Sequence, residues 1–262
     1  MATFKLNGAD IYYEEKGSGS AIIFTHGHSL FHKQWVPQID YFSDSYRTVL
    51  WDVRGHGNSS LPEGVVDPEL FSKDLAALME KLQLPPAILC GLSMGGHISL
   101  QTAVRYPDRV RALVLIGTPF TNTFNWFEKT SAPFSRFATR LIPLSVTARL
   151  TAIALSKITP SNHDLVKEAF GLMTHRNFIR HWSGNLRMES KDDLEKVKCP
   201  TLILYGDKDK MVGRQQAELG TRISGAISHP ITNAHHLTNL DNPNEVNRRI
   251  EKFLNEINAN SS

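Results

Sequence analysis

One serine in this sequence stands where the backbone must turn sharply, and a serine hydroxyl at such a turn can act as a nucleophile. Ser93 is the centre of Gly91-Leu92-Ser93-Met94-Gly95, in which small residues two before and two after the serine allow the turn and expose the hydroxyl. The apolar run 87–90 precedes the motif, and residues 94–106 can form a helix that Pro107 ends. A glycine-rich turn with an incidental serine is the alternative, but the strand-to-helix context favours a nucleophile.

A serine hydroxyl is a weak nucleophile at neutral pH, so it needs an imidazole base and a carboxylate that orients the imidazole. Candidates for both groups follow later apolar runs. Asp207 and Asp209 come after the run 201–205, and His235 and His236 come after a plausible last strand near 227–232. The sequence therefore predicts a Ser-His-Asp arrangement, with two candidates for the acid and two for the base.

The elements around these residues predict an α/β fold with a mostly parallel central sheet flanked by helices. A hairpin is expected over residues 3–16. Continuous apolar runs, typical of strands covered on both faces, occur at 21–25, 49–51, 87–90, 112–116 and 201–205. Helices are predicted after Asp67-Pro68 and from Asn242-Pro243. Reacting groups gather at the carboxyl ends of parallel strands, where the serine, aspartates and histidines lie.

The segment between Ile116 and Thr201 contains no comparable strand and is rich in prolines and aromatic residues. A structureless loop of this length is improbable in a compact domain, so we interpret it as an inserted helical cap. The predicted division is a core of residues 1–118 and 196–262 and a cap of residues 119–195. Aromatic side chains of the cap are expected to line a pocket over the serine, the alternative being that they only attach the cap to the core. The candidates are Phe124, Trp126, Phe127, Phe178 and Trp182.

The composition of the chain limits the classes of partner and ligand that we expect it to bind. The chain has 262 residues and a net charge of +3 without a basic block, so no nucleic-acid partner is expected. It shows neither a signal peptide nor an apolar run of about 18 residues, which predicts a cytoplasmic protein without a membrane partner. Cys90 and Cys199 are expected to be reduced, buried thiols. No H-E-x-x-H or paired Cys/His spacing occurs, so we predict no metal, and no cofactor is expected.

Five motifs in order resemble those of α/β-hydrolases of the cofactor-free esterase, 3-oxoadipate enol-lactonase and non-haem haloperoxidase type. They are His26-Gly27, Asp52-x-Arg54-Gly55-His56-Gly57-x-Ser59, Gly91-Leu92-Ser93-Met94-Gly95-Gly96, Gly206-Asp207-x-Asp209 and His236-Leu237-x-Asn239-Leu240-Asp241-x-Pro243. The resemblance covers nearly the whole chain except the cap. It implies an α/β-hydrolase fold with Ser93 as nucleophile, Asp209 as acid and His236 as base. His236 keeps the register to Pro243, which leaves His235 as a neighbour, and the aspartates could otherwise be turn residues.

Acyl transfer also needs hydrogen-bond donors for the oxyanion of the tetrahedral intermediate. The backbone N–H of Met94 supplies one, and the resemblance points to the residue after His26-Gly27, which is His28, for the second. A histidine departs from the apolar or aromatic residue usual there.

A serine nucleophile argues against the carbon–halogen and epoxide cleavage of relatives that use aspartate. The expected function is hydrolysis of carboxylic esters with small to medium acyl chains through an acyl-enzyme. Alternatives are an enol-lactonase, a C–C bond hydrolase of aromatic degradation, or a ligand-sensing receptor of the same fold that turns over slowly or not at all. The oligomeric state stays open.

Overall fold

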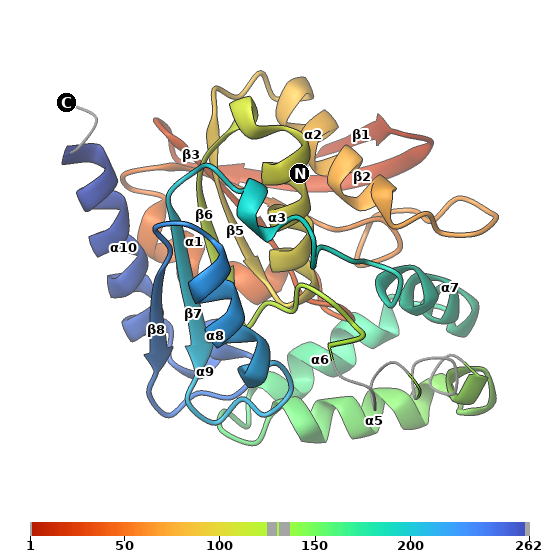
Figure 1. Cartoon of the computed structure of the whole chain (residues 1–262). Coiled ribbons are helices and arrows are strands. Elements are labelled where there is room, and N and C mark those ends of the chain that lie inside the picture. The colour runs from red at the N-terminus through yellow and green to blue at the C-terminus, as the bar shows by residue number, and fades with distance from the viewer. Residues whose placement is uncertain (1, 125–129, 131–136, 260–262) are drawn as a thin grey trace.

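The computed structural model describes all residues except 1, 125–129, 131–136 and 260–262 (Figure 1). Its centre is an eight-stranded sheet in the order β1-β2-β4-β3-β5-β6-β7-β8. The strands are β1 (Ala2–Leu6), β2 (Ala9–Lys16), β3 (Ala21–Thr25), β4 (Arg47–Trp51), β5 (Ala87–Leu92), β6 (Val110–Ile116), β7 (Thr201–Gly206) and β8 (Ile227–Ile231). β2 pairs antiparallel with both β1 and β4, and the strands β3 to β8 pair parallel with one another. The predicted fold class is confirmed.

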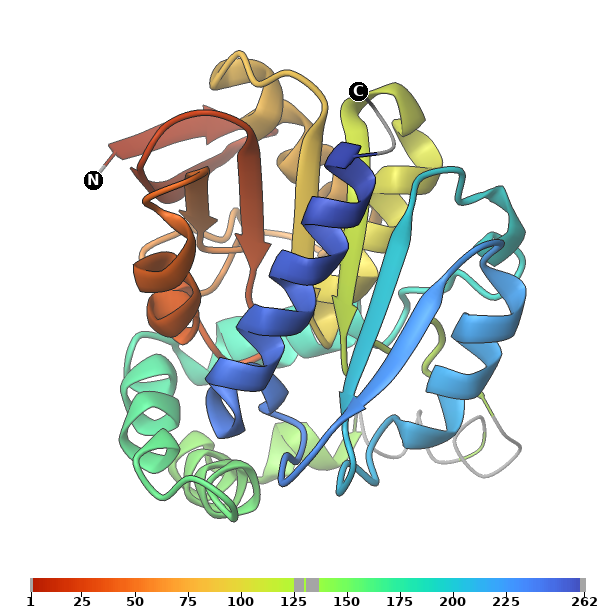
Figure 2. The same cartoon turned by 90° about the vertical axis from the view of Figure 1, so that its left-hand side faces the viewer.

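Helices cover both faces of the sheet, which explains the continuous apolar runs. They are α1 (Val36–Phe42), α2 (Glu69–Lys81), α3 (Met94–Arg105), α8 (Gly213–Arg222), α9 (Thr238–Asp241) and α10 (Pro243–Ala259). Successive residues of β3 point to opposite faces: Ile23 packs in a core with α2, α3 and α8, whereas Ile22 and Phe24 pack in a second core with α1 and α10. Figure 2 shows α10 in front of the sheet.

The long segment between β6 and β7 forms three helices in its described part, α5 (Leu144–Leu155), α6 (Asn162–Gly171) and α7 (His175–Asn185), and residues 137–141 are also helical. These helices lie across the carboxyl ends of the parallel strands (Figures 1 and 2). We call this segment the cap. Its separation from the core as a domain stays a prediction.

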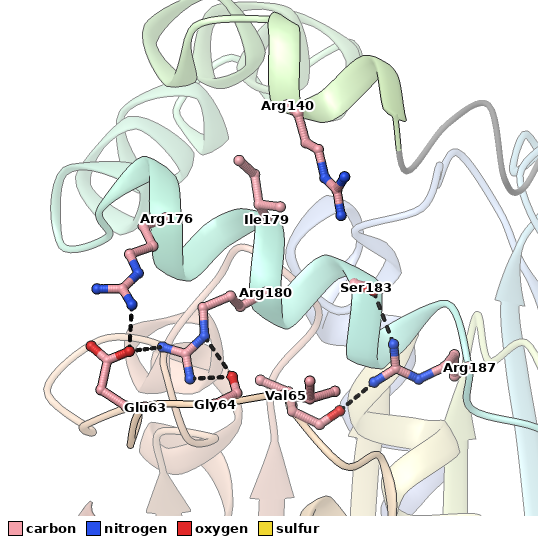
Figure 3. A pocket seen from close by; sticks show the side chains of 10 residues that line it. Glu63, Gly64, Val65, Arg140, Arg176, Ile179, Arg180, Ser183 and Arg187 are labelled. Atoms are coloured by element: carbon pink, nitrogen blue, oxygen red, sulfur yellow. Dashed lines mark hydrogen bonds and ion pairs between the residues drawn. The ribbon is translucent and has the colours of Figure 1, made fainter.

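Two arginines of α7 and Arg187, which follows the helix, attach the cap to the loop after β4 (Figure 3). Arg180 donates from Nε to the Gly64 carbonyl at 2.9 Å, and Arg187 donates to the Val66 carbonyl at 2.5 Å. Arg176 forms an ion pair with Glu63 at 2.5 Å. Because the guanidinium donors are held by backbone carbonyls, the position of α7 does not depend on exposed ion pairs alone.

Two sequence-based details differ from the structure. Helix α2 begins at Glu69, one residue later than Asp67-Pro68 suggested, although the Asp67 side chain does accept a hydrogen bond from the Glu69 amide at 3.0 Å. Both cysteines are free, but only Cys90 is buried; Cys199 is partly exposed because it precedes β7 rather than lying within it. Among the described residues, no helix combines the length and the apolar character that crossing a membrane requires.

A buried ion pair joins the loop after β4 to α2. The Arg54 guanidinium donates two hydrogen bonds to the Asp74 carboxylate at 2.6 and 2.7 Å, and Asn7 donates a third at 2.9 Å. The side chains of Arg54 and Asp74 are 3% and 0% exposed. Burial raises the pKa of the Asp74 carboxyl, and Arg54 opposes this rise. Such a pair is costly to break because the remaining charge stays buried without a partner.

We therefore expect Asp74→Ala to lower the free energy of unfolding by about 3–5 kcal/mol. The matched control is Glu69→Ala in the same helix, where exposed ion pairs with Lys73 and Arg105 are lost; the loss there should stay within about 1 kcal/mol. Urea denaturation of both variants measures the difference. Equal losses in the two variants would show that the buried pair of Arg54 and Asp74 contributes no more to stability than an exposed ion pair does.

Candidate active site

Ser93 lies at the turn between β5 and α3, in a backbone conformation that few non-glycine residues adopt. Its φ and ψ are +54° and −119°. The turn is closed so tightly that a Cβ on Gly91 would lie 2.3 Å from the backbone of Gly95, and a Cβ on Gly95 would lie 2.0 Å from the Thr25 carbonyl oxygen. The two glycines are thus required by backbone contact. The amide of Ser93 donates to the Ile116 carbonyl at 2.8 Å, which ties the turn to β6.

His236 and Asp209 complete a hydrogen-bonded line with Ser93. His236 follows β8, and its Nε2 lies 2.9 Å from Ser93 Oγ while its Nδ1 lies 2.8 Å from Asp209 Oδ2. A carboxylate only accepts, so Nδ1 carries the proton and Nε2 is free to accept the serine hydroxyl. Burial acts to raise the pKa of Asp209, but the hydrogen bond and charge of His236 outweigh it and hold this pKa below its ordinary value. The line has the geometry that serine activation needs.

The other candidate acid, Asp207, and the other candidate base, His235, make contacts away from Ser93. The Asp207 carboxylate accepts from the Ala234 amide at 3.1 Å and holds the loop after β8. The backbone amide of His235 donates to Asp241 at 2.9 Å, and no hydrogen bond joins its ring to Ser93. The structure therefore brings together Ser93, Asp209 and His236, the set that the resemblance implied.

The backbone amides close to Ser93 differ in whether the described chain offers them an acceptor. In the loop after β3, Gly27 donates to Gln34 at 2.9 Å, Ser29 to His56 at 3.1 Å, and Leu30 to the Gly27 carbonyl at 3.2 Å. Within the described chain the amide of His28 has no such acceptor. Met94 opens α3, where the first N–H groups of a helix lack intrahelical partners. Both Met94 and His28 line the same cavity as Ser93.

A cavity of about 660 Å³ lies over Ser93 between the core and the cap. Among the described residues that line it there is no Asp, Glu, Lys or Arg side chain. The lining is mostly apolar and includes Leu30, Pro119, Leu150, Leu155, Phe178, Trp182, Leu186, Met211 and Val212. A neutral, largely apolar molecule fits this environment better than a charged one.

Of the five aromatic residues predicted to line the pocket, Phe178 and Trp182 do so. Phe124 does not: its ring packs edge-on against Phe120, with centroids 5.8 Å apart, as part of the core. Trp126 and Phe127 lie outside the described residues. Sequence reasoning missed the polar lining residues Thr121, Asn122, Asn185 and Gln215. Nothing in the sequence indicated that Gln215 lines the cavity, because a side-chain amide on the amphipathic helix α8 resembles a surface residue.

Four arginines of the cap line a different pocket, of about 280 Å³, which we call the arginine pocket (Figure 3). Glu63, Arg140, Arg176, Arg180 and Arg187 contribute its charges. Phe178 and Trp182 of the same helix α7 line the larger cavity instead. The cations of α7 are therefore directed away from Ser93.

Three histidines meet under α7: His28, His56 and His181 each offer a ring nitrogen within 4.8 Å of the others. Three imidazoles have the composition of a metal site. However, Nε2 of His56 accepts a hydrogen bond from the Ser29 amide, so its proton is on Nδ1 and neither nitrogen keeps a free lone pair. Burial lowers the pKa of His28 to about 3 and lowers those of His56 and His181 well below the ordinary value. The arrangement favours three neutral rings, and the absence of a metal stays a prediction.

The comparison with protein families decides the classification. A model described as the alpha/beta hydrolase fold matches residues 20–243. The chain belongs to the α/β-hydrolase family. The solved structures of other α/β-hydrolases agree with this fold: an enol-lactonase from Burkholderia xenovorans has a TM-score of 0.86 at 22% identity, covering 97% of this chain and 100% of that one. A thermophilic esterase from Thermogutta terrifontis has a TM-score of 0.86 at 23% identity, covering 98% of both chains.

Two curated relatives of this α/β-hydrolase are similar over nearly their whole length. A 2-(acetamidomethylene)succinate hydrolase from Mesorhizobium japonicum is 38% identical and the match covers 92% of this chain and 90% of that protein. A putative non-heme chloroperoxidase from Synechocystis is 30% identical, over 94% of this chain and 95% of that protein. These two names differ in reaction as well as in substrate, so the relatives agree with the family and do not choose a substrate.

The buried histidines predict how stability depends on pH. Their folded pKa values are lower than the unfolded value of about 6.5, so below this pH the unfolded state binds protons that the folded state excludes. The free energy of unfolding should fall as pH decreases from 7 to 5, by up to about 1.4 kcal/mol per pH unit for each of His56 and His181. His181→Leu removes one of the groups that bind a proton on unfolding, so the free energy of unfolding should fall less steeply with decreasing pH in this variant. Urea denaturation at several pH values tests this, and an unchanged slope would contradict it.

Proposed function

We propose that this α/β-hydrolase cleaves carboxylic esters of small to medium acyl chains through an acyl-enzyme on Ser93. The observation that carries the proposal is the hydrogen-bonded line from Ser93 through His236 to Asp209 at the wall of a cavity of about 660 Å³. The described lining of this cavity lacks charged carboxylates and cations, which suits a neutral ester.

In the first half-reaction, Ser93 Oγ attacks the carbonyl carbon of the ester while His236 Nε2 takes the hydroxyl proton. Asp209 holds the ring in the correct tautomer and stabilises the imidazolium. The amides of Met94 and His28 donate to the developing oxyanion. The intermediate then expels the alcohol, which receives the proton from His236. Water attacks the acyl-enzyme by the same route and releases the carboxylic acid.

A second candidate is hydrolysis of an anionic lactone or amide, and the relatives favour it. Their names include a 3-oxoadipate enol-lactonase from Acinetobacter baylyi, 22% identical over 91% of this chain, as well as the 38% identical 2-(acetamidomethylene)succinate hydrolase. A carboxylate-bearing substrate calls for a cation in the pocket. In the part of the lining that the structure describes there is none, and Arg140, Arg176, Arg180 and Arg187 line the arginine pocket instead. We therefore rank the neutral ester first.

Ser93→Ala and His236→Ala should each reduce kcat/KM by about 10⁴-fold or more, and Asp209→Asn by a comparable factor, because the three groups act as a unit. Hydrolysis of p-nitrophenyl butyrate measures the loss, and a wild-type turnover of about 1 s⁻¹ or faster separates an enzyme from a ligand-sensing receptor. The matched controls are His235→Ala and Asp207→Asn, which should keep most activity. An inactive His235→Ala beside an active His236→Ala would reassign the base.

Acyl-chain preference tests the apolar cavity. Each added methylene that fits contributes up to about 0.8 kcal/mol, so kcat/KM should rise from acetyl to butyryl or hexanoyl esters and fall for long chains. Leu186 lines the cavity, and Leu186→Trp should move the optimum to shorter chains. Leu172→Trp is the control, since Leu172 is 46% exposed and does not line the cavity. A marked preference for substrates with a free carboxylate would favour the second candidate instead.

A further inference from the structure

Helix α5 of the cap carries an apolar stripe that faces solvent. Val146, Leu150 and Ile153 are spaced four and three residues apart, so they lie on one face of the helix, and they are 44%, 59% and 49% exposed. In the preceding helical stretch 137–141, Phe137 and Leu141 are also exposed, at 56% and 69%. Half of the exposed large hydrophobic side chains of the described chain lie within residues 137–153. A concentration of this kind is unusual on a monomer surface and indicates an interaction site.

The same segment is basic. The sequence from residue 129 to residue 163 contains five Lys or Arg residues and no Asp or Glu. Arg149 and Lys157 are exposed, and neither forms an ion pair with another described residue. We define the α5 face as Arg149 and Lys157 together with Phe137, Leu141, Ile142, Val146, Leu150 and Ile153. It combines exposed apolar area with positive charge that no described carboxylate pairs.

We propose that the α5 face binds an anionic lipid surface, with α5 lying along the surface. An amphipathic helix with apolar residues on one side and basic residues beside them is the pattern of peripheral membrane attachment. Each basic side chain near an anionic surface strengthens binding by about fivefold. The expectation of no membrane partner was drawn from the lack of a long apolar run, which concerns spanning helices and does not bear on this face.

Charge favours a lipid surface over a second copy of the chain. A two-fold dimer would place the α5 face against itself, because such an interface uses the same patch on both subunits. Arg149 and Lys157, which form no ion pair with a described residue, would then face their own equivalents, and like charges oppose association. An anionic surface complements them instead.

The α5 face also adjoins the mouth of the cavity over Ser93. Leu150 belongs to the stripe and lines this cavity, as does Met211, which is 60% exposed. Figure 1 shows α5 at the lower edge of the molecule, on the far side of the cap from the sheet. Attachment through α5 would therefore turn the cavity mouth toward the lipid. Binding itself does not require Ser93, so this inference stands independently of the proposed function.

Co-sedimentation with vesicles tests the inference. We expect the full chain to bind vesicles of equal parts phosphatidylcholine and phosphatidylglycerol, and to bind phosphatidylcholine alone at least tenfold more weakly. Val146→Glu and Ile153→Glu, neither of which lines the cavity, should each weaken binding at least tenfold, and Arg149→Gln about fivefold. Raising the salt concentration should also release the protein.

Two controls make the result specific. Ile227→Glu changes a 39% exposed apolar residue on β8, away from the cap, and should bind as the wild type does. Ser93→Ala should also bind normally. Absence of wild-type binding, or equal binding by Val146→Glu, Ile153→Glu and the wild type, would overturn the proposal. So would a wild-type dimer in size-exclusion chromatography with light scattering that Val146→Glu converts to a monomer.

Discussion

The close approach of three strand ends around Ser93 is the constraint on which the rest of the site depends. Helix α3 starts so near β3 that Gly95 leaves no room for a Cβ beside the Thr25 carbonyl, and Gly96 leaves none beside Thr118, where a Cβ would lie 1.9 Å from Oγ1. The turn therefore fixes the relative position of β3, β5 and the loop after β6. Ser93, Met94 and His28 line the same cavity, and their relative positions are fixed because these backbone segments cannot separate without losing contact.

Most of the fold and the hydrogen-bonded line were predictable because they depend on local signals. Strands buried on both faces require continuous apolar residues, and β3 and β7 were located from such runs to within one residue. Asp209 and His236 are adjacent in space only through the order of strands, but parallel strands bring their carboxyl ends to one edge regardless of the intervening sequence.

The cavity lining was less predictable, because it depends on which way each cap helix faces. Phe124 and Phe178 are equally aromatic, yet one packs against Phe120 and the other lines the cavity. No local sequence pattern distinguishes them, although Phe178 is buried and Phe124 only partly so. The meeting of His28, His56 and His181 was also missed, because it joins two core loops with a cap helix far along the chain.

Part of the contact between cap and core is polar, although Val166 and Phe170 of the cap also pack in the apolar core beside the sheet. Neutral histidines lie under α7, and the buried nitrogens of His181 have no hydrogen-bond partner among the described groups. Unsatisfied polar groups make a seam weaker than an apolar one of the same area, since each costs desolvation without a compensating bond. The arginine contacts to the loop after β4 offset part of this cost from outside. A cap attached in this way can separate from the core at lower cost than the sheet can open.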